Sequence, residues 1–537
     1  MHQRGQIVPT ADASTFSPCG LHAAAMSRPV LLEGLRRRLA RGGREVTLHE
    51  THLSWVLLAG RLAIKLKKPV RLPFLDFSTC PARRAACESE LTLNRRLAPS
   101  LYRRVVLVRG SADAPLFTGA GLPIDALLCM RRFPEDALLS RRLAAGTLDA
   151  RTVERLAQRI ARFHAAAGRA PDAGDAVDEA TAPLARVLVQ LAGLESGDWI
   201  DQATRWLQGS RRRLAPAFRA RRAQGAVREG HGDLHLANTV DLGSEVTAFD
   251  CIEFDTALRR IDVMNDVGFA TMDLEARGRP DLAHRFLDAY LAASGDYDGL
   301  AVLHFYETGR ACIRRLVQRL APRDEPEAPD YLALATRRMG AASGRPRLAI
   351  LCGVAGSGKS TVVAALVDAT GAVRVRSDVE RKRLRGLGSL DRGAAGDGMY
   401  GPQASAATYA RLADCARSAL SAGHDVLVDA AFLQRAQRAA FERLAGELQL
   451  PFNILVCEAP ASELRRRVAA RSAAGSDPSD ADVTVLERQW QTREGLADAE
   501  RPLSIAIDTG SPVDVIRLAA EWRTRAAASG DVRHLGR

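Results

Sequence analysis

The stretch LAILCGVAGSGKSTVVAALV, residues 348–367, decides the fold of the second half of this 537-residue chain. An apolar run leads into a glycine-rich loop and then into a second apolar run with helical spacing, which satisfies the pattern G-x-x-x-x-G-K-[ST] between a strand and a helix. Glycines permit a turn that aims backbone N–H groups at phosphate oxygens, and the helix amino terminus adds a partial positive charge. We therefore predict a phosphate-binding loop whose nucleotide-contacting residues are Gly353, Gly356, Ser357, Gly358, Lys359, Ser360 and Thr361.

Two residues of this loop have distinct predicted roles. Lys359 would reach the β- and γ-phosphates of ATP, and the hydroxyl group of Ser360 would hold Mg²⁺. The chain has 76 basic residues, of which only five are lysines, so each lysine marks a place where a compact ammonium group does what a guanidinium group cannot. This rarity strengthens the assignment of Lys359.

The sequence after residue 346 alternates between short apolar runs and helical stretches. Such alternation predicts an α/β unit with a parallel sheet that is covered by helices. The five predicted strands are LAILC (348–352), AVRVR (372–376), DVLVDA (425–430), FNILVCE (452–458) and LSIAID (503–508).

Acidic residues follow two of these strands, at the sheet edge where the ligands of α/β proteins gather. Asp378 comes directly after the second strand, and we predict that it accepts the proton of a substrate hydroxyl. Asp429 ends the third strand, where it is either an acid that holds Mg²⁺ or a buried carboxylate bonded to the phosphate loop. Arg471 lies in an arginine-rich helix before the Gly/Ser/Asp/Pro segment 472–482, and it is our preferred candidate for an arginine that a mobile lid closes over the phosphoryl group.

The motifs GVAGSGKST, SDVERKRL and VLVDAAF and the arginine-bearing lid resemble those of small P-loop kinases of the gluconate kinase, chloramphenicol phosphotransferase and zeta-toxin type. The resemblance covers about 180 residues. It implies ATP as phosphoryl donor, Asp378 as base or hydroxyl ligand, and Arg471 as the lid arginine. It also implies that Arg381 and Arg438 contact the substrate or a phosphate group.

A second constellation lies in residues 230–255, GHGDLHLANTVDLGSEVTAFDCIEFD. An Asp, an Asn five residues later and a second Asp after an apolar strand are typical of a kinase-like catalytic loop and its metal-binding acid. We predict that Asp233 accepts the proton of an attacking hydroxyl, and that Asn238 and Asp250 bind Mg²⁺. His231 would brace the loop through its ring nitrogens, whereas the pattern assigns no role to His235.

Upstream residues supply the partners that such a loop needs. The segment 51–70 predicts two strands joined near Ala59 and Gly60, and the second strand carries Lys65, which would contact the α- and β-phosphates. The following helical stretch, which we expect to begin near Glu88, carries Glu90 as the partner of that lysine. Because strand register is uncertain by a residue or two, Lys67 and Lys68 remain alternatives to Lys65.

The motifs HGDLHLAN and FDCIEFD, with Asp262 and Asp266 downstream, resemble the aminoglycoside phosphotransferase and choline kinase branch of the kinase-like fold over about 290 residues. The resemblance implies an α+β protein-kinase-like region that binds ATP. The whole arrangement resembles bacterial two-domain proteins that join such a module to a P-loop kinase-like ATPase, a combination that does not by itself name a substrate.

The chain thus divides into predicted domains by composition and pattern. A Pro- and acid-rich stretch begins at residue 321, which indicates a domain boundary. Met26 is an alternative start of translation. The predicted parts are a flexible tail at 1–26, a kinase-like domain at 27–325, a linker at 326–346, a P-loop domain at 347–525 and a frayed tail at 526–537.

Composition excludes several classes of protein. Hydrophobic residues make up 47% and charged residues 26%, as in ordinary globular proteins rather than disordered chains. No run of eighteen apolar residues and no secretory signal occurs, so we expect a cytoplasmic protein without a membrane partner. The net charge of +13 raises the question of nucleic acid, but aromatic residues are only 5% and the basic residues are dispersed, so this partner is not favoured.

These observations predict an ATP- and Mg²⁺-dependent phosphotransferase with two nucleotide sites and a small-molecule hydroxyl as acceptor. One alternative is a polynucleotide 5′-hydroxyl kinase in the C-terminal region, because Asp378 and Arg381 would suit a sugar hydroxyl. Another is an ATP-driven switch with an N-terminal pseudokinase. The sequence names neither the acceptor nor the oligomeric state.

Overall fold

The computed structural model describes residues 30–51, 53–72, 75–171, 174–320, 329–340, 344–388, 391, 401–474 and 482–531. These form two compact units, one made of the described residues up to Pro134 together with Glu253–Asp255, and the other of Glu135–Ile252 with the rest of the chain from Thr256. The units do not test the predicted boundary at 326–346, which stays a prediction. The predicted tail 1–26 lies outside the described residues.

The first unit contains a six-stranded sheet with the strand order β1-β2-β3-β8-β6-β7. β2 and β3 pair antiparallel as a hairpin that turns at Gly60 and Arg61, as the sequence predicts. The elements are α2 (Val30–Leu39), β1 (Val46–Glu50), β2 (Ser54–Ala59), β3 (Leu62–Lys67), β4 (Arg71–Leu72), β5 (Leu75–Asp76), α3 (Cys80–Asn94), β6 (Tyr102–Gly110), β7 (Pro115–Leu116) and β8 (Asp125–Arg131).

The alternation of β3 separates its apolar residues from its lysines. Ile64 and Leu66 are buried in a core that also contains Leu32 and Leu35 of α2. Because successive side chains of a strand point to opposite faces, the intervening lysines lie on the other face of the sheet, where α3 packs against β6 and β8. This periodicity, rather than any local motif, positions the lysines.

Helix α3 begins earlier than expected. Thr79 caps the helix by accepting a hydrogen bond from the backbone N–H of Ala82 at 3.3 Å, and Pro81 occupies its first turn. The helix therefore begins at Cys80, not near Glu88, and Glu90 lies in its second half. The prediction of the helix start was wrong because it overlooked this capping signal.

The second unit begins with a mainly helical part that carries two small two-stranded sheets, β10-β11 and β12-β9. Its elements are η1 (Glu135–Ala137), α4 (Leu139–Ala144), α5 (Ala150–Ala166), α6 (Ala176–Ala192), α7 (Asp198–Ala223), β9 (Val227–Glu229), η2 (Leu236–Asn238), β10 (Thr239–Asp241), β11 (Val246–Ala248), β12 (Arg260–Asp262), α8 (Val263–Ala276), α9 (Pro280–Ser294), η3 (Tyr297–Gly299), α10 (Leu300–Leu320) and α11 (Tyr331–Gly340).

The remainder of the second unit is built on a five-stranded parallel sheet with the order β14-β15-β13-β16-β17. All five predicted strands are present, and β13 and β16 begin and end where the sequence predicts. The elements are β13 (Leu348–Cys352), α12 (Lys359–Thr370), β14 (Val373–Arg376), α13 (Ser377–Arg383), α14 (Pro402–Ser421), β15 (Val426–Asp429), α15 (Arg435–Glu447), β16 (Phe452–Glu458), α16 (Ala461–Ala474), α17 (Val483–Thr492), η4 (Arg501–Leu503), β17 (Ser504–Asp508) and α18 (Val515–Asp531).

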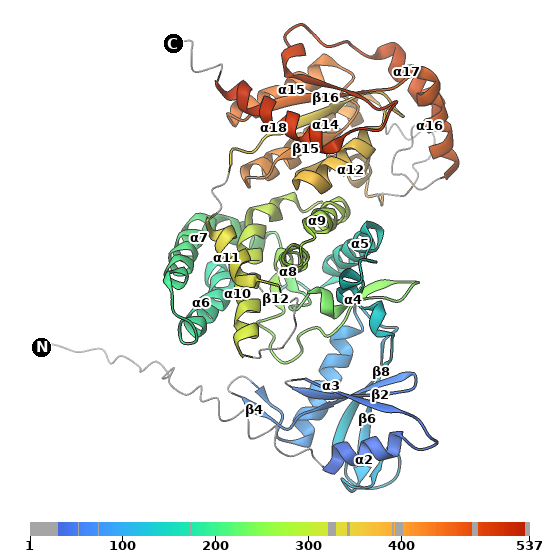
Figure 1. Cartoon of the computed structure of the whole chain (residues 1–537), viewed down its shortest axis with the longest axis vertical. Helices are drawn as coiled ribbons and strands as arrows, with labels where there is room; N and C mark the ends of the chain where they lie inside the picture. The colour runs from blue at the N-terminus through green and yellow to red at the C-terminus, as the bar shows by residue number, and fades with distance from the viewer. Residues whose placement is uncertain are drawn as a thin grey trace, which may run out of the picture. The chain divides into compact units, whose positions relative to one another are not determined.

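Helices cover both faces of this parallel sheet (Figure 1). On one face, α12 and α18 bury a core that contains Leu351, Leu366 and the fully buried Trp522. α18 continues to Asp531, so the first part of the predicted tail 526–537 is helical. Among the described residues, every helix is too short or too polar to cross a membrane.

Candidate phosphate-binding sites

The loop between β13 and α12 has the backbone conformation that its glycines permit. Gly353, Gly356 and Gly358 have φ values of +154°, +79° and +80°, a region that favours glycine. Gly358 caps α12 without a side chain, and the first N–H groups of a helix have no acceptor within it. The loop therefore presents backbone donors at a helix amino terminus, as an anion site requires.

Close packing explains why two of these positions hold glycine. A Cβ atom on Gly353 would lie 2.7 Å from the carbonyl oxygen of Cys457, and one on Gly356 would lie 2.8 Å from that of Leu464. Both neighbours are backbone atoms, which cannot rotate away. The shape of the loop is thus fixed by β16 and α16 as well as by its own sequence.

The side chain of Lys359 folds back so that its amine contacts this loop. Its Nζ donates hydrogen bonds of 2.8 Å to the carbonyl oxygens of both Gly353 and Val354. Burial lowers the pKa of Lys359, which the carboxylate of Asp429 only partly offsets. A phosphate group in the loop would supply the counter-charge that this buried amine needs.

Ser360 and Asp429 meet beside the loop. The hydroxyl of Ser360 donates to Oδ2 of Asp429 at 3.1 Å, and Nε of Arg374 donates to the same oxygen at 3.2 Å. Burial would raise the pKa of Asp429, but Arg374 and Arg376 hold it below its ordinary value. Asp429 is therefore an ionised carboxylate bonded to the phosphate loop, a geometry that fits both of its predicted roles.

Asp378 and Arg381 lie together in the first turns of α13. Nη1 of Arg381 is 3.6 Å from Oδ1 of Asp378, whose side chain is 27% exposed. The charge of Asp378 also acts on the pKa of Lys359. Asp378 thus lies within electrostatic reach of the phosphate loop, and its catalytic role remains a prediction.

Arg438 does not have the role that the resemblance implies. It is only 1% exposed, and it forms a two-point ion pair with Glu500, with N–O distances of 2.7 and 2.9 Å. Its remaining donors bind the carbonyl oxygens of Phe432, Glu494 and Gly495. Because its donors are directed at the protein, Arg438 holds the chain segment 494–500 in place.

The predicted lid arginine, Arg471, lies near the end of a described segment of the chain. Arg471 belongs to α16, but its side chain and residues 475–481 lie outside the described residues. Instead, Arg467 reaches the loop region, where it donates to the carbonyl oxygen of Thr509 at 2.7 Å and to that of Gly356 at 3.4 Å. The arginine triplet that contains Arg467 gave no sign of which member faces inward.

The catalytic loop of the helical part brings Asp233 and Asn238 together. Nδ2 of Asn238 donates to Oδ2 of Asp233 at 2.8 Å and to its carbonyl oxygen at 3.0 Å. The amide nitrogen therefore faces Asp233, and the amide oxygen is the atom that can accept a cation. Asp250 lies beyond the β10-β11 hairpin at a φ of +63°, which Asp tolerates better than most residues.

A buried carboxylate shapes this loop. Asp266, fully buried on α8, accepts hydrogen bonds from the backbone N–H groups of His231 and Gly232 at 2.6 and 2.8 Å. The His231 ring braces the loop as predicted, since Nδ1 lies 3.2 Å from the N–H of Asp233 and Nε2 lies 2.9 Å from the carbonyl oxygen of Phe249. His164 also contacts Asp266, at 3.2 Å, and is a buried histidine with both ring nitrogens engaged.

His235 has a role that the sequence did not reveal. Its Nε2 lies 3.3 Å from Oδ2 of Asp233, while its Nδ1 accepts the backbone N–H of Ala237. Desolvation would raise the pKa of Asp233, but His235, His231 and Arg310 together hold it well below its ordinary value. The sequence assigned no role to His235, because two residues that lie two positions apart in an irregular loop give no periodic signal.

The lysines of β3 form a buried charge cluster in the first unit. Nζ of Lys65 lies 2.8 Å from Oε1 of Glu90, and Nζ of Lys67 lies 2.5 Å from Oε2. Lys67 also pairs with Glu253, whereas Lys68 pairs with Glu50. Burial would raise the pKa of Glu90, but the two ammonium groups hold it well below its ordinary value.

The lysines differ in exposure. Lys65 is 11% exposed and Lys67 only 1%. Lys65 is therefore the member of the pair that remains accessible to a ligand, and Lys67 is the one that neutralises Glu90 and Glu253. Lys65 and Glu90 belong to one unit and Asp233 to the other.

The donor sets fit Mg²⁺ only in company with phosphate. Among the described residues, no three His, Cys, Asp or Glu side chains cluster as a metal site. The phosphate loop and the catalytic loop each offer one hydroxyl or amide oxygen and one carboxylate. Mg²⁺ in proteins is commonly bound by one or two such groups together with substrate phosphates and water. Ser360 with Asp429, and Asn238 with Asp250, are such sets.

Comparisons with known proteins support a family relationship. An uncharacterized protein of Mycobacterium tuberculosis is 30% identical over 464 residues, which make up 83% of this chain and 91% of the relative. Residues 348–496 match a family model described as an AAA domain. This match contains the phosphate loop and the first four strands of the parallel sheet.

Two solved structures are similar at lower identity. A putative kinase from Chloroflexus aurantiacus is 19% identical, covering 34% of this chain and 99% of that chain, with a TM-score of 0.29. A choline/ethanolamine kinase family protein from Mesorhizobium loti is 14% identical, covering 57% and 92%, with a TM-score of 0.35. Both TM-scores are below 0.5, and the fold is therefore assigned from the strand order and the loop geometry alone.

Proposed function

The chain belongs to the same family as the mycobacterial protein described above, and we propose that it transfers the γ-phosphoryl group of ATP to a hydroxyl group of a small molecule. Two nucleotide sites would do this, one at the phosphate loop and one at the catalytic loop around Asp233. Each of the two sites would bind its nucleotide through its own residues.

The observation that carries the proposal is the geometry of the phosphate loop. Three glycines with positive φ, a buried lysine amine at the loop carbonyls and a serine hydroxyl held by an acid occur together at the amino terminus of α12. Such a site suits a polyphosphate because it combines backbone donors, one cation and a ligand for Mg²⁺.

Each group of the phosphate loop has an assigned task. Backbone N–H groups and Lys359 bind the phosphates, and Thr361 follows Ser360 in the first turn of α12. Mg²⁺, when bound by Ser360 near Asp429, would neutralise charge between the β- and γ-phosphates. Asp378 accepts the proton of the acceptor hydroxyl, and Arg471 contacts the phosphoryl group when the lid closes.

The second site depends on side chains rather than on a glycine loop. Asp233 stays ionised because its pKa is lowered, so its carboxylate is in the form that can accept a hydroxyl proton. Asn238 and Asp250 would hold Mg²⁺ in the second unit. In the first unit, Lys65, oriented by Glu90, would contact nucleotide phosphates. The Lys65–Glu90 ion pair in the first unit and the His231 brace in the second unit each favour an active kinase over a pseudokinase.

The test measures transfer of labelled γ-phosphate from ATP into a bacterial metabolite extract. Wild type, Asp233→Ala, Asp378→Ala and the double variant would be compared, with the labelled products separated. We expect each single variant to lose one set of products and the double variant to lose both. Asp281→Asn, which alters a partly exposed acid at the start of α9 that pairs with Arg279, serves as the matched control.

The pattern of lost products shows which of the two carboxylates, Asp233 or Asp378, serves the transfer reaction. Products that survive unchanged in the double variant would refute the assignment of both carboxylates. Loss of all products in Asp378→Ala, with none lost in Asp233→Ala, would assign the chemistry to the phosphate loop alone.

A further inference from the structure

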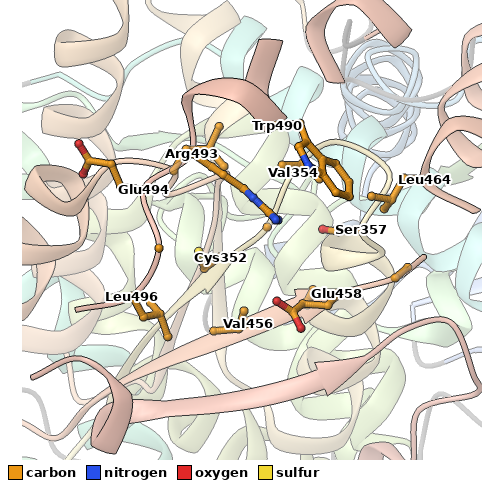
Figure 2. Close-up of a pocket in the computed structure, with 15 residues that line it drawn as sticks. Cys352, Val354, Ser357, Val456, Glu458, Leu464, Trp490, Arg493, Glu494 and Leu496 are labelled. Atoms are coloured by element: carbon orange, nitrogen blue, oxygen red, sulfur yellow. The ribbon is translucent and has the colours of Figure 1, made fainter. Parts of the chain in front are cut away.

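A cavity of about 380 Å³ opens beside the phosphate loop. Gly353, Val354 and Ser357 of the loop form one side, and the segment that follows α17, residues 493–496, forms the opposite side (Figure 2). Neither Asp378 nor any other residue of α13 lines it. No role predicted from the sequence accounts for this space.

The cavity lies where the topology of the sheet favours a ligand. Its floor is formed by Cys352 at the end of β13 and by Val456, Cys457 and Glu458 at the end of β16. The chain leaves β13 toward β14 on one side of the sheet and leaves β16 toward β17 on the other. The crevice between these two strands is thus the switch point of the sheet, where α/β proteins bind ligands.

Two opposite charges face this space. Arg493 and Glu458 extend into the cavity from its two sides, whereas the carboxylate of Glu494 turns away (Figure 2). Arg493 lies over the ring of Trp490, 4.6 Å from its centre, which orients the guanidinium group. Among the described residues, neither Arg493 nor Glu458 has an ion-pair partner, so both are available to a ligand.

The segment that carries Arg493 is held rigidly. Gln434 Nε2 donates to the carbonyl oxygen of Thr492 at 2.8 Å, and the N–H of Glu494 donates to that of Leu433 at 2.8 Å. The buried ion pair of Arg438 with Glu500 fixes the residues that follow. The cavity is therefore a preformed site, in which a ligand would meet a positioned guanidinium group.

The lining indicates the chemistry of the ligand. A guanidinium group recognises a carboxylate or a phosphate, and a carboxylate such as Glu458 accepts hydrogen bonds from hydroxyl groups. Trp490, Leu433 and Leu496 supply apolar walls for a carbon skeleton.

We propose that this cavity binds the phosphoryl acceptor, and that the acceptor is a hydroxylated small molecule with an oxyanion group that pairs with Arg493. The inference rests on the proposed function. In the reaction, the acceptor hydroxyl oxygen bonds to the γ-phosphorus, the bond from that phosphorus to the bridging oxygen of ADP breaks, and the hydroxyl proton passes, at the phosphate-loop end, to Asp378, which lies outside the cavity lining. The oxyanion lies at the Arg493 end of the cavity, and the reacting hydroxyl lies at the phosphate-loop end.

The experiment uses the full chain carrying Asp233→Ala, so that only the phosphate-loop site contributes. A bacterial metabolite extract is separated at neutral pH on an anion exchanger into retained and unretained fractions, and labelled γ-phosphate transfer is measured into each. The variants are Arg493→Gln, Arg493→Lys and the control Arg488→Gln, an exposed residue of α17 that does not line the cavity. Binding of a non-hydrolysable ATP analogue is measured in parallel.

We expect transfer into the retained, anionic fraction only. Arg493→Gln should lower it about 10- to 100-fold, as expected for loss of a charge-assisted hydrogen bond. Arg493→Lys should restore part of it, and Arg488→Gln should leave it unchanged.

Other results would overturn the inference in identifiable ways. Transfer into the unretained fraction, or transfer that Arg493→Gln does not lower, would refute the anionic acceptor while leaving the kinase intact. Loss of ATP-analogue binding in Arg493→Gln would assign Arg493 to the nucleotide instead. Absence of transfer into both fractions, with the analogue still bound, would refute the proposed function itself.

Discussion

The two candidate sites hold their reactive groups by different means. Around Lys359 the binding groups belong mainly to the backbone, and glycines at 353, 356 and 358 set their direction. Around Asp233 they belong to side chains, and the loop is shaped by the buried carboxylate of Asp266 and the ring of His231. A backbone site fails when atoms are added, whereas a side-chain site fails when groups are removed.

The difference also affects charge. The phosphate loop has a buried cation whose pKa is lowered, so it requires an anionic ligand to complete it. The catalytic loop has an acid whose pKa is lowered by neighbouring histidines, so it stays ionised at neutral pH. The first site is thus suited to binding phosphate, and the second to activating a hydroxyl group.

The largest expected effect follows removal of the loop cation. In the Asp233→Ala background, Lys359→Ala should lower γ-phosphate transfer by at least about 100-fold, because a preorganised charge at the phosphates is lost. Lys359→Arg should not restore transfer, since a planar guanidinium group cannot occupy the place where Nζ meets two carbonyl oxygens. Full activity of the Arg variant would contradict the described geometry.

The lysines of β3 provide a second contrast. Lys67→Met should destabilise the protein by about 3–5 kcal/mol, because it leaves Glu90 and Glu253 buried with one cation fewer. Lys65→Met should cost less stability but should lower transfer in the Lys359→Ala background. Thermal unfolding and transfer assays on both variants check this division. Equal loss of stability in both would show that Lys65 is structural too.

Adding a methyl group should break the backbone site. Gly356→Ala should lower the free energy of unfolding by about 2–4 kcal/mol, because the strain at positive φ is joined by a contact with the carbonyl oxygen of Leu464. Gly423→Ala is the matched control: its φ of +91° is similar and no heavy atom lies near the added methyl, so it should cost about 1 kcal/mol from strain alone. Denaturant unfolding measures both, and equal values would exclude the steric explanation.

The smallest effect concerns pH. Because the pKa of Asp233 is lowered, it stays ionised as the pH falls, so transfer at this site should show no acid limb between about pH 5 and 8. His235→Leu removes the largest lowering influence and should raise the pKa of Asp233, so that the acid limb of kcat/KM lies at higher pH than in the wild type when the profile is extended below pH 5. The profile is measured in the Lys359→Ala background. An unchanged limb would remove His235 from this role.

Local patterns made much of this architecture predictable. The apolar runs fixed β13 and β16, the glycine spacing located the phosphate loop, and the alternation of β3 placed Lys65 on the face that meets Glu90. These features depend on residues that are neighbours in sequence or on one periodic element. The start of α3 was predictable in the same way, from Thr79 and Pro81.

Contacts between distant segments could not be predicted. Asp266 lies 35 residues from the N–H of His231, and Arg438 lies 62 residues from Glu500. Arg493 is one of many arginines in the sequence. Only the folded chain shows that its side chain extends into a cavity beside the phosphate loop. No periodicity marks which of several similar side chains will meet a partner across the fold.

The number of nucleotides bound per chain tests the central claim most directly. Calorimetric titration of the full chain with Mg²⁺ and a non-hydrolysable ATP analogue should give two molecules bound in the wild type and one in Lys359→Ala. A single bound molecule in the wild type, or none in Lys359→Ala, would contradict two independently built sites.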